Sequence, residues 1–180
     1  MQTVKMVITG PFCSGKTQLI RSISEIDVVS TESKITNPAE RVKPETTVAM
    51  DFGRITIDDD LVLYLFGTPG QRRFDFMWEI LSEGMLGFIV MVDSARPETF
   101  REARYILQVF RSYAPTPYVV AANKQDMPDA WSPDDLRIAL KVDPAVKVLP
   151  CVATDKEQVK QVILELLYAI LERMDQDGNR

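Results

Sequence analysis

The stretch Gly10-Pro11-Phe12-Cys13-Ser14-Gly15-Lys16-Thr17 decides the fold of this chain. It reads G-x-x-x-x-G-K-T, follows an apolar run over residues 3–9 and precedes residues 18–23, which can begin a helix. A strand, a glycine loop and a helix in this order are the context of a P-loop, whose backbone N–H groups turn toward phosphate oxygens. There Lys16 would reach the β- and γ-phosphates, and the Thr17 hydroxyl would ligate Mg²⁺. The alternative is a chance match in an ordinary strand-turn-helix. The predicted phosphate-binding residues are Gly10, Phe12, Cys13, Ser14, Gly15, Lys16, Thr17 and Gln18.

Length and composition limit what the chain can be. Its 180 residues suit a single domain over 1–180, and a net charge of −5 argues against nonspecific nucleic-acid binding. The sequence has no run of about 18 apolar residues, so we expect no membrane span. Two unpaired cysteines fit the reducing cytoplasm, and residues 177–180 hold no prenylation cysteine, so we expect no lipid anchor of that kind. There is no histidine, so any hydrolysis must position its water by other means.

The order of apolar segments predicts an α/β fold. Strands alternate with helices, except for one hairpin formed by residues 47–57 and 61–66. We therefore expect a P-loop NTPase domain with a mostly parallel six-stranded sheet, one antiparallel edge strand and helices on both faces. Residues 25–45 lose helical periodicity and predict a long loop.

A second motif, Asn123-Lys124-Gln125-Asp126, directly follows the predicted strand at 117–122. Ligands bind at this end of the strands in open α/β sheets. The Asp126 carboxylate can accept hydrogen bonds from guanine N1–H and the N2 amine, a donor pair that adenine lacks. We expect Asn123 to tie this loop to the P-loop, and the Lys124 stem to lie over the purine. Alone, N-K-x-D is a weak four-residue match, and such a match more often lies in an ordinary solvated loop than in a nucleotide site.

Together these motifs resemble Ras-like small GTPases over nearly the whole chain. The P-loop, a threonine before the second strand, Thr68-Pro69-Gly70-Gln71 after the third, N-K-x-D and a late alanine occur in order. Within that family the sequence is most similar to bacterial members, such as the gliding-motility polarity GTPase and the small GTPases encoded beside roadblock-domain proteins.

The resemblance implies a switch that binds GTP and GDP with Mg²⁺. Thr47 matches the first-switch threonine that joins Mg²⁺, with Thr46 as the alternate. Gly70 matches the γ-phosphate sensor and Gln71 the glutamine that orients water. Ala153, with Thr154 beside it, matches the segment whose backbone N–H meets guanine O6.

One departure from the family concerns the metal. Gly67 stands where the family usually has an aspartate that holds a Mg²⁺-bound water. If the hairpin turn centres on Asp59, residues whose numbers sum to about 118 face each other, and Asp51 lies opposite Gly67. Asp51 either supplies the missing carboxylate, directly or through water, or is a solvated acid on the strand.

Other departures concern hydrolysis. Phe12 stands where most of the family has glycine. It either crowds the γ-phosphate or, as we slightly favour, points away into an apolar cluster. Arg72 and Arg73 flank Gln71 and either supply charge in cis or are solvated. Both possibilities for Phe12 predict slow intrinsic hydrolysis.

The segment Arg72–Trp78 is rich in aromatics, Met and Arg, which are enriched at the cores of interfaces. Some of these side chains must instead pack beneath the second switch, which is the alternative for Phe76 and also for Trp78. We favour a mixed role, in which Phe74 and Trp78 contribute to a nucleotide-dependent partner face. With the 25–47 loop, this face would bind a roadblock-type or other protein partner.

The sequence thus predicts a cytoplasmic GTPase that hydrolyses GTP slowly, depends on an activator and acts in bacterial signalling or cell polarity. The alternative is a nucleotide-binding scaffold with little or no hydrolysis. A third reading, an ATP-dependent small-molecule kinase, is disfavoured by residues 123–126.

Overall fold

The computed structural model describes residues 1–35 and 46–179, and within these only the backbone of 30–35 and 46–49. The strands are β1 (Gln2–Thr9), β2 (Val29–Ile35), β3 (Thr46–Asp58), β4 (Leu61–Gly67), β5 (Gly87–Asp93), β6 (Tyr118–Asn123) and β7 (Val148–Pro150). The α-helices are α1 (Lys16–Ile23), α2 (Phe76–Ser82), α3 (Phe100–Tyr113), α4 (Pro133–Leu140) and α5 (Lys156–Gly178). Two short 3₁₀ turns, η1 (Arg72–Phe74) and η2 (Pro97–Thr99), precede α2 and α3.

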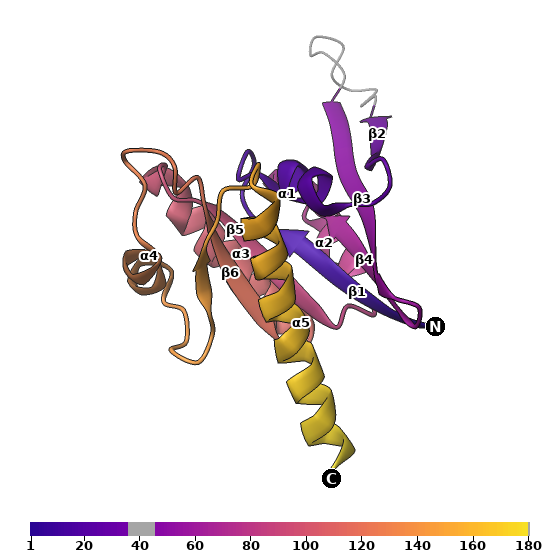
Figure 1. The fold of residues 1–180 in the computed structure, drawn as a ribbon. Coiled ribbons are helices and arrows are strands. Elements are labelled where there is room, and N and C mark those ends of the chain that lie inside the picture. Colours follow the sequence, from indigo (N-terminus) through magenta and orange to yellow (C-terminus); the bar gives the residue numbers. More distant parts are fainter. Residues whose placement is uncertain (36–45, 180) are drawn as a thin grey trace.

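The strands form one sheet in the order β2-β3-β4-β1-β5-β6-β7 (Figure 1). β1 pairs in parallel with β4 and β5, and the parallel pairing continues through β6 to β7. β3 runs antiparallel to both of its neighbours. The predicted mostly parallel α/β fold, with helices on both faces, is confirmed.

The number of strands differs from the prediction, because strand β2 lies inside the stretch 25–45 that was expected to be a loop. In the described part of the chain the sheet has seven strands rather than six, and β2 rather than β3 forms its edge. The sequence Val29-Ser30-Thr31-Glu32-Ser33-Lys34-Ile35 is mostly polar, so it carries little strand signal. The rest of the expected loop, residues 36–45, lies outside the described residues.

The hairpin register matches the prediction. Asp51 pairs with Gly67, and the pairs continue to Thr56 opposite Val62 before the register shifts near the turn. This pairing fixes which β3 side chains lie near the ends of β4 and β1.

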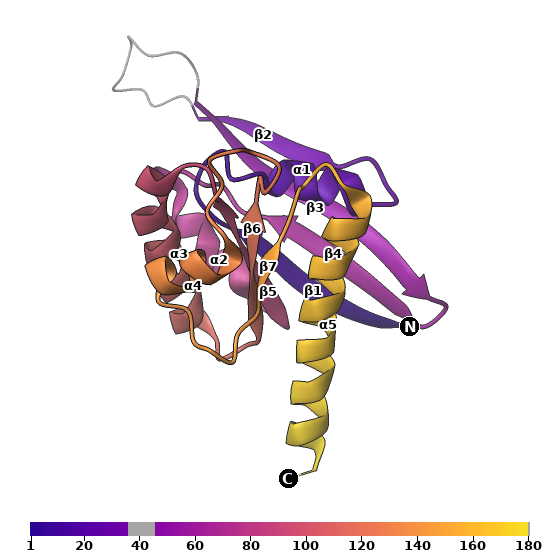
Figure 2. The same ribbon diagram turned by 60° about the vertical axis from the view of Figure 1, so that its left-hand side comes forward.

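Two hydrophobic cores lie on the two faces of the sheet. Helices α1 and α5 pack on one face, around Leu19, Ile20, Val162 and Leu166. Helices α2, α3 and α4 pack on the other, around Trp78, Phe110 and Leu136. Figure 2 shows the sheet between these layers, with the phosphate loop at the end where the parallel strands finish.

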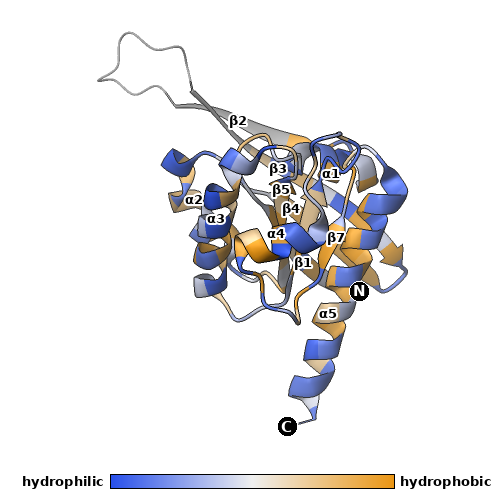
Figure 3. Ribbon diagram, turned by 90° about the vertical axis from the view of Figure 1, so that its left-hand side faces the viewer, coloured by the Kyte–Doolittle hydropathy of each residue, from blue (hydrophilic) through white to orange (hydrophobic). Residues whose placement is uncertain are grey.

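Helix α5 is longer than the sheet it covers. Its buried side chains end at Ile170, and its last turns extend away from the body and are largely hydrophilic (Figure 3). No helix in the described ranges is long and apolar enough to cross a membrane.

Candidate nucleotide site

Glycines at two positions are required by close packing in the loop between β1 and α1. Gly10 has φ 146° and Gly15 has φ 105°, both in the region that favours glycine. A Cβ on Gly10 would lie 2.3 Å from the Met91 carbonyl oxygen, and one on Gly15 would lie 2.2 Å from Nδ2 of Asn123. Only glycine lets this loop fit against β5 and β6.

The Lys16 side chain is buried and held by the loop itself. Its Nζ donates to the carbonyl oxygens of Gly10 and Pro11, each at 2.8 Å. Burial lowers the pKa of Lys16 from 10.5 to about 8, while the nearby Asp51 carboxylate raises that pKa. An anionic ligand beside this ammonium would favour its charged form.

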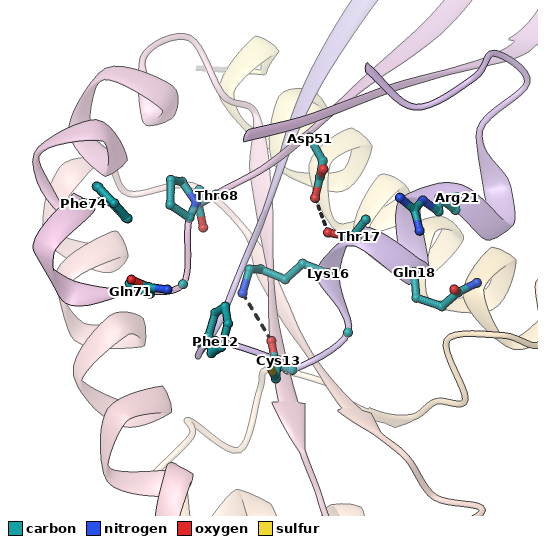
Figure 4. Close-up of a pocket in the computed structure, with 14 residues that line it drawn as sticks. Phe12, Cys13, Lys16, Thr17, Gln18, Arg21, Asp51, Thr68, Gln71 and Phe74 are labelled. Atoms are coloured by element: carbon teal, nitrogen blue, oxygen red, sulfur yellow. Dashed lines mark hydrogen bonds between the residues drawn. The ribbon is translucent and has the colours of Figure 1, made fainter. Parts of the chain in front are cut away.

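A pocket of about 360 Å³ opens above the loop (Figure 4). It brings together residues from the P-loop, β3 and the segment after β4, as the sequence predicted for the phosphate end. Arg21 and Phe74 also line it, and neither was predicted to belong to the site. Its lining is Phe12, Cys13, Ser14, Gly15, Lys16, Thr17, Gln18, Arg21, Asp51, Thr68, Pro69, Gly70, Gln71 and Phe74.

The residues predicted to recognise the base are not part of the lining of this pocket. Asn123 is buried, donates from Nδ2 to the Ser14 carbonyl at 2.9 Å and accepts from the Ala153 N–H at 2.9 Å. The predicted tie between Asn123 and the P-loop is therefore present. The same amide also binds the segment of Ala153, so three segments converge on one side chain. Asp126 and Thr154 are exposed next to it.

The Ala153 N–H has a protein partner in this arrangement. Its bond to Oδ1 of Asn123 means that guanine O6 would have to share this donor. The role of Ala153 toward guanine stays a prediction.

Lys124 is held by a residue that sequence reasoning missed. Its backbone is left-handed, with φ 62°, and its Nζ donates to Oδ2 of the buried Asp93 at 2.6 Å. A longer bond of 3.4 Å reaches the Cys13 carbonyl. Asp93 ends β5 directly opposite Asn123 in β6, and this pairing of strand ends was the available signal.

The end of the pocket where Mg²⁺ was predicted contains a threonine and a carboxylate. The Thr17 hydroxyl donates to Oδ2 of Asp51, and Figure 4 shows the two side chains facing each other from α1 and β3. In the described residues no group of three His, Cys, Asp or Glu side chains could hold a metal ion. The backbone of Thr47 lies in β3, but its side chain, like that of Thr46, is outside the described residues.

The segment after β4 folds back onto the P-loop. A Cβ on Gly70 would lie 2.6 Å from the backbone nitrogen of Phe12 and 2.9 Å from Nζ of Lys16, so Gly70 reaches the phosphate end as expected. Gln71 lines the pocket, and its Oε1 accepts a bond of 2.6 Å from Nε of Arg73.

Phe12 differs from the favoured prediction. It does not point into an apolar cluster, because its side chain is 61% exposed and lines the pocket near Lys16. Phe12 and its neighbour Cys13 form the exposed part of the loop, between the buried residues Pro11 and Ser14.

The burial of residues 72–78 differs from the favoured prediction and, at Trp78, agrees with the alternative. Trp78 is fully buried and donates from Nε1 to the Pro69 carbonyl at 2.8 Å, and Phe74 is also buried, whereas Phe76 is 58% exposed. The partner face predicted for Phe74 and Trp78 is therefore wrong, because both side chains are buried, and Phe76 faces solvent. Arg72 turns toward α3, where it stacks 3.9 Å from the centre of the Tyr105 ring and pairs with Glu102 at 3.6 Å.

Comparison with known proteins adds three relatives and one family. The model of a family described as conserved hypothetical ATP-binding proteins matches residues 27–173. An uncharacterized protein of Methanocaldococcus jannaschii is 33% identical over 70% of this chain and 73% of its own length. ADP-ribosylation factor-like protein 14 of Mus musculus is 26% identical over 66% of the chain and 67% of its own length. The mutual gliding-motility protein MglA of Myxococcus xanthus is 25% identical over 76% and 74%.

Proposed function

Because the chain belongs to the family of conserved hypothetical ATP-binding proteins and is homologous to Ras-superfamily small GTPases, we propose that it is a switch that binds GTP and GDP with Mg²⁺. The observation that carries this proposal is the Asn123 amide, which joins the P-loop to the N-K-x-D loop through bonds of 2.9 Å to Ser14 and to Ala153. The loops proposed to bind the phosphates and the base are thereby bonded to each other through one side chain.

The family description names ATP, so the choice of base is the first point to establish. Asp126 is exposed in the loop that follows β6, and its carboxylate would accept from guanine N1–H and N2. With adenine this carboxylate would be left without donors. We therefore assign the site to guanine.

Competition binding tests that assignment. A fluorescent GDP should be displaced by unlabelled GDP at concentrations at least about 100-fold lower than by ADP, since a site built to pair polar groups strongly rejects a ligand that lacks them. Asp126→Asn should shift preference toward xanthosine diphosphate, whose 2-carbonyl accepts from the new amide. Asp129→Asn, an exposed acid in the same loop, is the matched control. Displacement by ADP and GDP at equal concentrations would contradict the proposal.

The phosphate chemistry follows from residues of the same pocket. Lys16 would stabilise charge on the β- and γ-phosphates, Gly70 would sense the γ-phosphate through its N–H, and Gln71 would orient the attacking water. Thr17 and Thr47 would hold Mg²⁺, which when bound neutralises charge that develops on the phosphates. Ordering of Thr47 and the Gly70–Gln71 segment around GTP, and relaxation after hydrolysis, would make the switch.

Slow, activator-dependent hydrolysis is the second part of the proposal. Phe12 lines the phosphate pocket and occupies space beside Lys16. Gln71 already binds Arg73 through the same oxygen that a water would need, and Arg72 is held at α3. An activator that moves the 72–78 segment would release Gln71.

We place the protein in the cytoplasm, in signalling or polarity, by analogy with the gliding-motility relative; a roadblock-type partner stays a prediction.

A scaffold with little or no hydrolysis is the second candidate, and the Gln71–Arg73 bond is the observation that favours it. Single-turnover hydrolysis of bound GTP separates the two. We expect a measurable rate that Gln71→Ala lowers about tenfold to 100-fold, as for loss of a transition-state contact of a few kcal/mol. A rate equal to that of free GTP would favour the scaffold.

A further inference from the structure

Asp51 is a buried carboxylate in the wall of the phosphate pocket. Its side chain is 5% exposed, yet it is one of the residues that line the pocket. Burial of a carboxylate is unfavourable unless partners or a metal compensate for it. Its position therefore points to a role in the site.

The described partner of Asp51 is the P-loop threonine. The Thr17 hydroxyl donates its hydrogen to Oδ2 of Asp51. A hydroxyl that donates its hydrogen keeps lone pairs with which it can ligate a cation. Thr17 and Asp51 can thus act on one ion together, and P-loop NTPases hold Mg²⁺ with a threonine or serine and an aspartate.

The strand next to Asp51 leaves space for its carboxylate. Gly67 of β4 pairs with Asp51 across the hairpin. A Cβ on Gly67 would lie 3.2 Å from the Asp51 Cβ, 3.4 Å from its Oδ2 and 3.0 Å from Cδ1 of Ile20. Two side chains at this pair would crowd each other, so this space holds one carboxylate, and it comes from β3.

We infer that Asp51 supplies the carboxylate of the Mg²⁺ site, from strand β3 rather than from the end of β4. The inference rests on the proposed function, because it concerns the metal of the same nucleotide site. It assigns Thr17 and Asp51 as the protein groups that make nucleotide binding depend on Mg²⁺.

Release of a fluorescent GDP measures this dependence directly. In the wild type, excess Mg²⁺ should slow release at least about tenfold relative to excess EDTA, since a ligand that bridges protein and phosphates adds binding free energy of over 1 kcal/mol. Asp51→Asn keeps the shape and an acceptor for Thr17 but removes the charge. We expect its release to be fast in both media, with the EDTA rate within about twofold of wild type.

Two further variants make the result specific. Asp59→Asn, an exposed acid at the hairpin turn, should keep the wild-type ratio of the two rates. In Asp51→Gly/Gly67→Asp the carboxylate moves to β4, into space that the removal of the Asp51 side chain, Cβ included, leaves open, and at least part of the Mg²⁺ effect should return. That return would show that the site needs a carboxylate at this place in the sheet.

The outcomes separate the two proposals. If wild type binds GDP and Asp51→Asn keeps the full Mg²⁺ effect, the assignment of Asp51 is wrong, while the proposed function stands. If wild type binds no guanine nucleotide in either medium, the proposed function fails. A folded double variant without any Mg²⁺ effect would also count against the inference.

Discussion

The ammonium of Lys124 lies 2.6 Å from Oδ2 of Asp93, a carboxylate that is 3% exposed at the end of β5. Oδ1 of Asp93 accepts from the backbone N–H of Ala95 at 3.1 Å, which fixes the carboxylate. The pair holds Lys124 with its Nζ 3.4 Å from the Cys13 carbonyl oxygen of the P-loop. We therefore expect Asp93 to act on the proposed nucleotide site through Lys124.

Replacing Asp93 by Asn should weaken nucleotide binding. The amide keeps the shape but loses the charge-assisted bond, which contributes about 1.5–3 kcal/mol, so we expect the Kd for GDP to rise about tenfold. The ratio of release rates in EDTA and Mg²⁺ should not change, because the Asp93 carboxylate bonds with Lys124 and Ala95 rather than with the residues proposed to hold Mg²⁺. Titration with fluorescent GDP measures the Kd of Asp93→Asn and of the control Asp129→Asn. An unchanged Kd for Asp93→Asn would mean that nucleotide binding does not depend on the bond between Asp93 and Lys124.

Lys16 should titrate near physiological pH. Burial lowers its pKa from 10.5 to about 8, so between these values the unfolded chain binds more protons than the folded one. The free energy of unfolding of the nucleotide-free protein should therefore rise with pH across this window, and the destabilising contribution of charged Lys16 should be fully present below pH 8. With GDP bound, the phosphates should keep Lys16 charged through the window.

Carbon-13 NMR of the lysine ε-methylene groups can test this directly. The Lys16 signal, assigned by its loss in Lys16→Arg, should shift with a midpoint near 8 in the free protein and show no such midpoint with GDP. A midpoint above 10 in the free protein would contradict the prediction.

Trp78 and Phe76 should affect stability very differently. Trp78→Phe removes the bond to the Pro69 carbonyl and part of a fully buried ring, so the free energy of unfolding should fall by about 1–3 kcal/mol. Phe76→Ala, at an exposed position two residues earlier, should change it by less than about 0.5 kcal/mol. Urea unfolding with bound GDP measures both, and equal losses would show that Phe76 is packed rather than free to meet a partner.

The two cysteines should differ in reactivity. Cys13 is exposed in the P-loop, while burial raises the pKa of the Cys151 thiol to about 12. A maleimide should therefore label only Cys13 in the folded protein, and Cys13→Ser should abolish labelling. GDP should slow the reaction, because Cys13 lines the phosphate pocket. Labelling of Cys151 at a similar rate would contradict the assigned burial.

The sequence was most informative where a motif or a turn fixed positions. The turn at Asp58–Asp60 sets the hairpin register, which is why Asp51 could be placed opposite Gly67. The tie from Asn123 to the P-loop followed from two motifs that share one end of a parallel sheet. Both predictions depend on backbone pairing, which local sequence determines well.

Side-chain directions in the second switch were less predictable. The 3₁₀ turn η1 precedes α2 and shifts the helical phase, so spacing alone could not tell that Trp78 is buried and Phe76 exposed. Phe12 was misplaced because its direction depends on a loop turn rather than on a repeating pattern. Asp93 was missed because it ends a uniformly apolar strand, and its partner Lys124 lies on a different loop.

The single amide of Asn123 should also influence the order in which the parts of a bound nucleotide leave the proposed site. It closes the base half of the site with bonds to Ser14 and Ala153, and Gly15 packs against it without space for a methyl group. The phosphate end is closed by the half-buried segment of Gly70 and Gln71 and by the Thr17–Asp51 contact. If the proposed function holds, we expect exchange to begin at the phosphates, and a factor that speeds it to act on β3 and on the Gly70–Gln71 segment, with the base released last.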